Sequence, residues 1–345
     1  MRVSISDVAA KAGTSISTVS KVLSNARGYR ISEATARRVK EAARELNYRP
    51  SSTARQLRFQ RTDTIGIIVP FLTTPFYVDI IRGIQEVMWE NGRTVVLAIS
   101  DEESALERRH LTMALQRRVD GLLVVPARNN ENADLYDELK DAGIPFVFVD
   151  RCLPDYEANY VGTDNREGAY RATRYLLAQG ARKICHIGGR GGNTALVERF
   201  RGYRKALEEE GIELDPSLVG GGVPAEIDQA VRRFVAIRPR IEGAFMCSYL
   251  YLRMALPALI DVGIRVPTDL RMVGFDSVFF SLSDGSDYGA TKAITAPLPT
   301  VIQPRYEIGC KAAEILLADL SQGGTETFRQ IRLAPRYERI DPDGR

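Results

Sequence analysis

The chain has 345 residues, of which 44% are hydrophobic and 26% charged, a composition typical of a globular protein with two or three domains. It has no apolar run of about 18 residues, the length that indicates a membrane-spanning helix, and its first residues lack the apolar core of a secretory signal. The four cysteines and two histidines show neither disulfide-framework nor zinc-ligand spacing. We therefore expect a cytoplasmic protein with reduced thiols, no metal site and no contact with membranes.

Basic residues are concentrated at the start of the chain. The first 60 residues hold 12 Lys and Arg against 4 Asp and Glu, a net charge of +8, whereas the remaining residues hold 35 against 40, a net charge of −5. A basic head on a mildly acidic body indicates an anionic partner for the head, with nucleic acid as the first candidate. A solvated basic surface without any partner is the alternative.

Three short helices are expected in this head. Apolar residues recur at helical spacing over 5–12, 19–23 and 39–46, and Ser15 and Ser32 can cap the second and third helices. Two helices joined by a tight glycine-containing turn, with a third beside them, make a helix-turn-helix unit whose second helix enters the major groove of DNA. A plain three-helix bundle without a ligand is the alternative.

The second helix and the turn before it supply the expected DNA contacts. Ile16, Ser17 and Lys21 lie on the polar side of this helix and would meet base edges, while Thr14 and Ser20 would meet phosphates. The full set expected in the head is Thr14, Ser15, Ile16, Ser17, Thr18, Ser20, Lys21 and Ser24.

Residues 5–15 (ISDVAAKAGTS) and 17–23 (STVSKVL) resemble the head of the LacI/GalR family of bacterial transcription regulators, and residues 48–57 (YRPSSTARQL) resemble its hinge. The resemblance extends over nearly the whole chain. It implies a helix-turn-helix DNA-binding head over 1–48, a hinge helix and linker over 49–62, and a two-lobed effector-binding and dimerisation domain over 63–345.

In the hinge, the resemblance implies that Arg55 and Leu57 contact DNA. Residues 51–58 are polar and basic and too short for a stable isolated helix, so we expect them to fold only on DNA. Leu57 would then be a wedge between base pairs in the minor groove that kinks the duplex. Packing of Leu57 onto the body is the alternative.

The body alternates apolar strands with amphipathic helices. Its first half contains expected buried strands over 64–69, 95–99, 122–125 and 146–149, with helices near 76–91, 103–117 and 131–142. The series restarts after residue 162, with strands over 183–187, 243–247 and 271–275 and helices near 166–179, 197–210, 225–236 and 249–262. This pattern predicts two similar α/β lobes, each a doubly wound parallel sheet.

The resemblance implies that these lobes form a periplasmic-binding-protein-like fold. Lobe one would comprise about 63–161 and 302–322, and lobe two about 163–299 and 326–340. The chain would then cross between lobes near 161–163, 299–302 and 322–326, with a helix near 305–320 returning to lobe one. The segment 277–292 is longer than expected, and it is either a lid over the cleft or a surface loop.

Ligands of open α/β sheets bind at the carboxyl ends of the strands, so two facing lobes share one cleft. At these ends, aromatic side chains can stack on a ring, Asp150 can accept hydrogen bonds from hydroxyl groups, and Arg151 can pair with Asp150 or an anion. The resemblance implies that Arg199 and Asp276 bind the effector, whereas Ser248 and Tyr249 replace the family's Asn-Asp pair. The expected set is Phe71, Phe76, Tyr77, Asp150, Arg151, Arg199, Ser248, Tyr249 and Asp276; loop packing and surface salt bridges are the alternatives.

The resemblance implies a sequence-specific DNA-binding transcription regulator, a repressor in preference to an activator, that binds a pseudo-palindromic double-stranded operator as a homodimer. Its effector would be a small metabolite, with a carbohydrate or derivative as the first candidate and a nucleoside or another ring compound as the alternative that the aromatic residues leave open. Neither a cofactor fingerprint nor a nucleophile–base pair is visible, so we expect no enzyme, catalytic residue or cofactor. A metabolite-binding protein of the same fold without specific operator binding is the alternative.

Overall fold

The computed structural model describes residues 3–23, 31–48, 62–73, 75–117, 119–127, 131–237, 240–276, 296–322 and 327–340. Its internal contacts divide the chain into two compact units, Met1–Thr62 and Asp63–Arg345. Three sequence predictions fall outside the described residues: the hinge helix and linker over 49–62, of which only Thr62 is described, the segment 277–292, and the DNA contact expected at Ser24.

The first unit contains the three expected helices, α1 (Ile5–Ala12), α2 (Ile16–Leu23) and α3 (Glu33–Glu45). The predicted caps are present, because the Thr18 main-chain N–H donates to Ser15 Oγ at 3.1 Å and that of Thr35 donates to Ser32 Oγ at 3.2 Å. Val8, Val19 and Val39 come one from each helix and are fully buried in a shared core. The prediction of three helices packed together in the head is confirmed.

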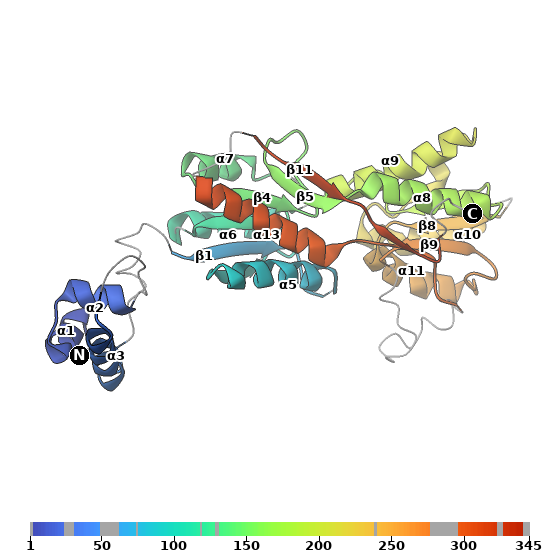
Figure 1. The fold of residues 1–345 in the computed structure, drawn as a ribbon. Coiled ribbons are helices and arrows are strands. Elements are labelled where there is room, and N and C mark those ends of the chain that lie inside the picture. Colours follow the sequence, from blue (N-terminus) through green and yellow to red (C-terminus); the bar gives the residue numbers. More distant parts are fainter. Residues whose placement is uncertain are drawn as a thin grey trace. The chain divides into compact units, whose positions relative to one another are not determined.

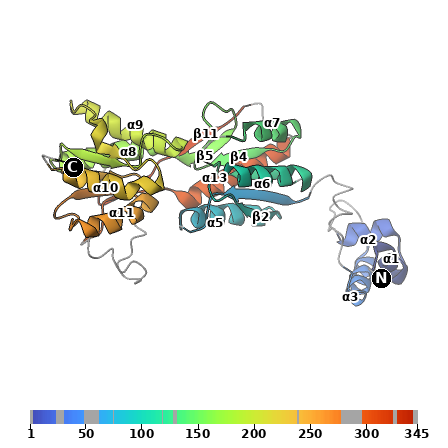
Figure 2. The same cartoon turned by 180° about the vertical axis from the view of Figure 1, so that it is seen from behind.

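In the part of the second unit that the structure describes, the strands form two six-stranded sheets, shown from opposite sides in Figures 1 and 2. The first sheet has the order β11-β5-β4-β3-β1-β2, and all of its pairs are parallel. Its strands are β1 (Thr64–Val69), β2 (Thr94–Ile99), β3 (Gly121–Val124), β4 (Phe146–Val149), β5 (Asn159–Thr163) and β11 (Gln330–Leu333). Its helices are α5 (Pro75–Glu90), α6 (Ser104–Arg117), α7 (Ala133–Asp141) and α13 (Arg305–Gln322).

The two faces of the first sheet bury alternate side chains of each strand. Ile67 and Val147 pack with α5 and α13 on one face, whereas Ile68 and Phe148 pack with α6 and α7 on the other. This alternation makes the strands continuously apolar, as expected for a parallel sheet covered on both sides. One expectation is wrong: residues 95–99 are not a buried strand, because β2 lies at the edge of the sheet and most of its side chains are exposed.

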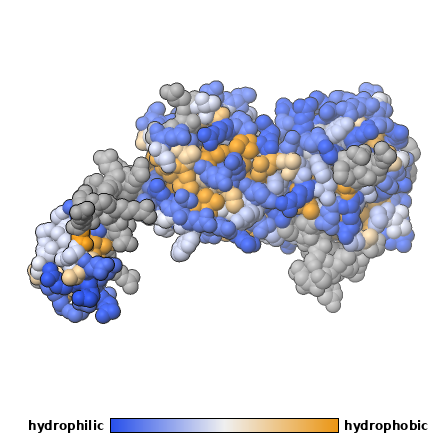
Figure 3. Space-filling view, viewed as in Figure 1, coloured by the Kyte–Doolittle hydropathy of each residue, from blue (hydrophilic) through white to orange (hydrophobic). Residues whose placement is uncertain are grey.

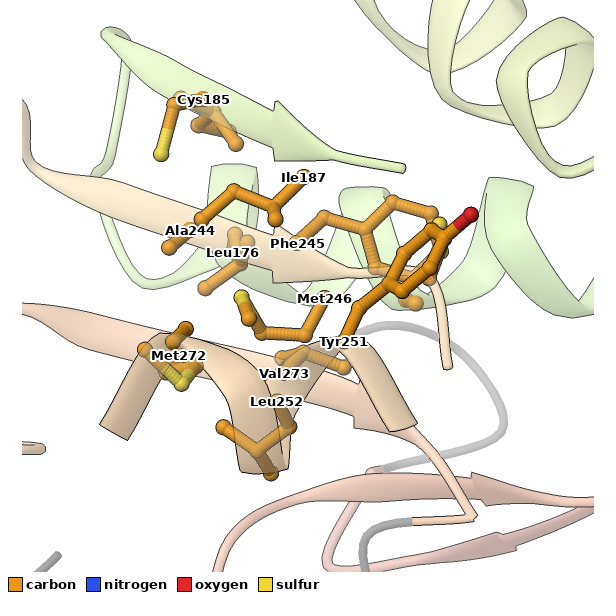
Figure 4. Close-up of a cluster of buried hydrophobic side chains, with 14 of the residues drawn as sticks. Leu176, Cys185, Ile187, Ala244, Phe245, Met246, Tyr251, Leu252, Met272 and Val273 are labelled. Atoms are coloured by element: carbon orange, nitrogen blue, oxygen red, sulfur yellow. The ribbon is translucent and has the colours of Figure 1, made fainter. Parts of the chain in front are cut away.

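The second sheet has the order β12-β10-β9-β8-β6-β7, in which only β10 and β12 pair in antiparallel fashion. Its strands are β6 (Ile184–Ile187), β7 (Val219–Gly220), β8 (Gly243–Met246), β9 (Arg271–Phe275), β10 (Thr300–Ile302) and β12 (Arg336–Glu338). The helices are α8 (Asn165–Ala178), α9 (Thr194–Glu209), α10 (Ile227–Ala236) and α11 (Tyr249–Asp261), with short 3-10 turns at Pro216–Leu218 and Pro224–Glu226. Figure 4 shows part of its core, where Phe245 and Met246 lie among side chains such as Leu176 and Leu252.

Within the described residues, the chain passes between the two sheets three times, at 164 after β5, at 303–304 after β10 and at 334–335 after β11. The first two places lie close to the predicted crossings near 161–163 and 299–302. The third corrects the prediction of 322–326, because β11 pairs with β5 and keeps the chain in the first lobe through Leu333. In between, α13 returns to the first lobe and lies alongside α5 (Figure 1).

Candidate functional site

A cavity of about 330 Å³ lies within the second unit, where residues at the carboxyl ends of both sheets come together. All nine predicted effector residues line it: Phe71, Phe76, Tyr77, Asp150, Arg151, Arg199, Ser248, Tyr249 and Asp276. The other lining residues were not predicted from the sequence; they are Glu102, Asn193, Ala195, Leu196, Leu250, Tyr251 and Gln303. The volume is within the range of small-molecule sites.

Asp150 follows β4 and takes a left-handed backbone conformation with φ of 66°. The Tyr77 hydroxyl donates to Asp150 Oδ2 at 3.2 Å, and Arg151 Nη2 donates to the Tyr77 oxygen at 3.1 Å. Burial raises the pKa of Asp150, while the charges of Arg151 and Arg199 act against this rise. The carboxylate is therefore held in place at the cavity wall but is costly to ionise, which favours a ligand that donates hydrogen bonds to it.

Arg151 is engaged by the protein to a greater extent than the sequence indicates. Its two terminal nitrogens donate to the two carboxylate oxygens of Glu102, at 2.9 and 2.7 Å. Such a bidentate pair is strong and directional. Arg151 thus supports Tyr77 and Asp150 from the side, and its guanidinium is already neutralised before any ligand binds.

Arg199 lies in the second turn of α9, since this helix begins at Thr194 and not near 197 as predicted. Its Nε donates to Asn165 Oδ1 at 2.7 Å, and its Nη1 donates to the Cys247 carbonyl. The guanidinium carbon lies 3.9 Å from the centre of the Phe275 ring. Among the described residues, Nη2 has no hydrogen-bond partner, so this group can donate to a ligand.

Asp276 is the counterpart of Asp150 in the second lobe. It follows β9 with φ of 56° and accepts hydrogen bonds from the main-chain N–H of Gln303 at 3.0 Å and from the Gln303 side-chain amide at 2.7 Å. Burial raises its pKa, and the charge of Arg305 counteracts that rise. Both oxygens of Asp276 are thus already engaged in this structure.

Aromatic side chains form the rest of the wall. The Tyr77 ring packs edge-on against those of Phe71 and Phe76, with ring centres 5.3 and 4.9 Å apart. On the second lobe, Ser248 Oγ accepts from the Tyr251 main-chain N–H at 3.3 Å and so caps α11. Ser248 is therefore used for the cap, whereas Tyr249 adds an aromatic surface to the cavity.

One missed residue, Glu102, could have been found by the rule that ligands lie at strand ends. Glu102 comes shortly after β2, as Asp150 comes after β4. Gln303 directly follows β10, but this strand has only three residues and its sequence, TVI, is too short to be distinguished from other apolar runs.

In the first unit, Ser15, Ile16 and Ser17 are exposed at the start of α2, and Thr14, Thr18, Ser20 and Lys21 are half-buried. The Ile16 side chain is 49% exposed, although Val19 and Val22 of the same helix are buried. The predicted contacts Ser24, Arg55 and Leu57 lie outside the described residues.

The described residues contain neither a helix long and apolar enough to cross a bilayer nor a group of three His, Cys, Asp or Glu side chains placed to hold a metal ion. All four cysteines are free thiols.

Comparison with known proteins matches both units of the chain. Residues 4–51 match the family described as "Bacterial regulatory proteins, lacI family", and residues 65–324 match "Periplasmic binding protein domain". The ribose operon repressor of Halalkalibacterium halodurans is 33% identical over 94% of this chain and 92% of its own. The repressor PurR of Vibrio atlanticus is 33% identical over 91% and 90%. The solved structure of the regulator CelR with cellobiose aligns at a TM-score of 0.68, with 30% identity over 98% of both chains.

Proposed function

Because this chain belongs to the LacI family of bacterial regulatory proteins, we propose that it is a repressor whose head binds operator DNA and whose cavity binds a carbohydrate or a carbohydrate derivative. As a member of the family it is a DNA-binding transcriptional regulator controlled by a small-molecule effector. The proposal adds the chemical class of the effector, the residues that hold it and the dimer through which it acts.

The convergence of Asp150, Arg199 and Asp276 with aromatic side chains in one cavity carries this proposal. Carboxylates accept hydrogen bonds from hydroxyl groups, the unpartnered nitrogen of Arg199 donates one, and aromatic faces cover the apolar side of a ring. Two relatives support the same class, since one is named for a ribose operon and another was solved with cellobiose. Tyr249, which replaces a polar residue of the family, favours an effector with an extended apolar face.

A homodimer is the assembly that this proposal requires. Edge strand β2 and the adjacent helix α5 expose apolar side chains, which we call the α5–β2 face: Val78, Trp89, Val96, Leu97 and Ile99. Trp89, the only tryptophan of the chain, is 83% exposed. An exposed apolar edge strand favours association, and a two-fold dimer matches a pseudo-palindromic operator.

The effector acts by changing the angle between the lobes. In a dimer such a change alters the spacing of the two heads and therefore their fit to the two half-sites of the operator. A coupling free energy of about 1–3 kcal/mol between cavity and operator is enough for a genetic switch. The same role places the protein in the cytoplasm with the DNA, and it assigns no catalytic step to the cavity.

Selection of genomic fragments tests the DNA half of the proposal. Fragments of the source genome retained by the full-length protein at near-physiological salt are sequenced, and a few enriched pseudo-palindromes are expected. Retained fragments without a common sequence would favour the alternative of a metabolite-binding protein without a specific operator.

Arg199→Ala tests the cavity half, with D-ribose and cellobiose as the probes. Loss of the Arg199 hydrogen bond to a ligand is expected to weaken binding at least about tenfold, since hydrogen bonds to charged groups contribute roughly 1.5–3 kcal/mol, while affinity for the selected operator is retained. Arg201→Ala is the matched control, because Arg201 lies on the same helix, is exposed and pairs with Glu198 outside the cavity. Equal probe affinity in wild type and Arg199→Ala, or no binding of either sugar, would contradict the proposed class of effector.

A further inference from the structure

Arg305 lies behind the cavity, where the chain returns from the second lobe to the first. It is the first residue of α13 and comes directly after the second crossing, and it does not line the cavity itself. Its side chain is placed between two carboxylates. The Nε atom is 3.0 Å from Asp79 Oδ2, and the Nη1 atom is 3.4 Å from Asp276 Oδ1.

The two carboxylates belong to different lobes. Asp79 is on α5, which packs on the first sheet, whereas Asp276 follows β9 of the second sheet. Arg305 therefore connects the helix that carries Phe76 and Tyr77 to the aspartate on the opposite wall of the cavity.

Arg305 moves with the first lobe because α13 and α5 are in backbone contact. A Cβ atom added to Gly83 would lie 2.3 Å from the Tyr306 carbonyl oxygen, and one added to Gly309 would lie 2.1 Å from that of Ile80. Such close packing leaves no room for the two helices to slide past each other. The contact between Arg305 and Asp276 is therefore a contact between a rigid helix pair of one lobe and the other lobe.

Gln303 holds the crossing itself together. It donates twice to Asp276, and its side-chain oxygen accepts from the Thr163 hydroxyl at 2.8 Å, which ties the second crossing to the first. All of these bonds involve Gln303, which lies within the second crossing itself. The longer Arg305–Asp276 contact spans the joint, so it is the one that a change of angle between the lobes would lengthen.

We propose that Arg305 is a positioning residue that acts through Asp276. Its ion pairs with Asp79 and Asp276 hold the second lobe against α5, and we call this link between the lobes the latch. An effector hydroxyl group that binds Asp276 competes with Arg305 for the same carboxylate and weakens the latch. The inference rests on the proposed function, in which Asp276 faces the effector. Since α5 also contributes Val78 and Trp89 to the α5–β2 face, the latch links the cavity to the surface assigned to the dimer.

The distance between the lobes tests this inference without DNA and without any effector. Spin labels are attached to the full-length protein at Glu138→Cys in α7 and Glu213→Cys after α9, both exposed positions, with Cys152→Ser and Cys310→Ser removing the accessible native thiols. Double electron–electron resonance then gives the distribution of distances between the lobes.

Arg305→Met is expected to shift or broaden the distribution, and Asp276→Asn, whose side chain also tolerates a left-handed backbone, is expected to do the same. Because both variants remove the same contact between Arg305 and Asp276, their effects in the double variant should be less than additive. Asp134→Asn is the matched control: it removes the partner of a bidentate arginine, Arg108, within the first lobe only, and it should leave the distribution unchanged.

A wild-type distribution in folded Arg305→Met, or additive effects of the two substitutions, would overturn the inference. Should Arg305→Met not fold, Asp79→Asn replaces it, since Asp79 is partly exposed and Asn is nearly the same size; an unchanged distribution there would overturn the inference equally. An unchanged interlobe distance in the variants would not affect the selection of operator fragments, and a selection without enriched sequences would not affect the measured distances. The two experiments therefore test the two proposals separately.

Discussion

Asp150 and Asp276 occupy matching places in the two lobes, each directly after a central strand and each with a left-handed backbone, at φ of 66° and 56°. Both are almost completely buried and face one cavity. A non-glycine residue in this conformation is uncommon, and Asp and Asn tolerate it best. The carboxylates are also close enough that the charge of Asp276 contributes to the raised pKa of Asp150.

The raised pKa of Asp150 predicts that this residue costs stability at neutral pH. The native state holds the proton more tightly than the unfolded chain, so the free energy of unfolding should fall as pH rises from about 4 through the native pKa. Asp150→Asn removes this loss and should be more stable than wild type at pH 7 but not at pH 3.5, as measured by urea unfolding. Asp134→Asn should behave oppositely, because Arg108 lowers the pKa of Asp134; the same sign for both variants would contradict the assignment.

We expect the buried His186 to lower the free energy of unfolding in acid. It is fully buried against Phe200, Tyr203 and Phe245, neither ring nitrogen has a hydrogen-bond partner among the described residues, and burial lowers its pKa from 6.5 to about 3. Below pH 6.5 the unfolded chain takes up a proton that the native state refuses, so this residue should remove about 1.4 kcal/mol per pH unit down to its native pKa.

His186→Phe keeps a ring in the same surroundings. It should reduce the slope of the unfolding free energy against pH between pH 6 and pH 4 by the contribution of one proton. His186→Leu is the second variant. It also lacks the titrating imidazole but has no ring, so an effect common to both variants comes from proton uptake and not from the packing of the ring. Slopes equal to wild type in both variants would show that His186 is not the group that titrates.

We expect the α5–β2 face to form the dimer interface. Leu97 is 39% exposed at the sheet edge, and Leu97→Lys would place a charge within the interface, so the dissociation constant of the dimer should rise at least about tenfold, equivalent to roughly 1.4 kcal/mol. Sedimentation equilibrium measures it. Val223→Lys, which places the same charge at an exposed apolar residue of the second lobe, should leave the constant unchanged; equal effects would move the interface away from β2.

We expect Lys21 to contribute to the salt dependence of operator binding. If its ammonium meets a phosphate, Lys21→Ala should weaken binding and reduce the slope of log affinity against log salt by about one unit. Fluorescence anisotropy over a range of salt concentrations measures this slope. Lys11→Ala is the control, because Lys11 pairs with Glu45 at 2.6 Å within the head. A reduced affinity with an unchanged slope would assign Lys21 to a base edge.

Long apolar strands and capped helices could be predicted from the sequence because their signals are local. Residues 64–69 and 146–149 are continuous apolar runs, and Ser15 and Ser32 occupy cap positions. Strands β5, β7, β10, β11 and β12 were not predicted, since each is short or carries polar side chains, as in the sequence QIRL of β11. Their pairing depends on strands more than 30 residues away in the chain for β12 and more than 160 for β11.

The cavity residues were predictable to the extent that they follow recognisable strands or match the family. The partners of those residues were not. Nothing in the sequence near Arg151 indicates that Glu102, 49 positions earlier, neutralises it, and Arg305 lies 29 positions beyond Asp276. The first pair arises from packing within the first lobe and the second from packing between the lobes, so only the three-dimensional structure assigns them.

The three crossings also determine the order in which this protein can fold on the ribosome. Neither sheet is finished by a continuous stretch of chain: the first waits for α13 and β11, and the second waits for β10 and β12, all of which follow residue 299. During synthesis both lobes therefore expose unpaired strand edges until the last part of the chain emerges. A nascent chain halted after α11 would be a substrate for chaperones, and it could not yet form the cavity.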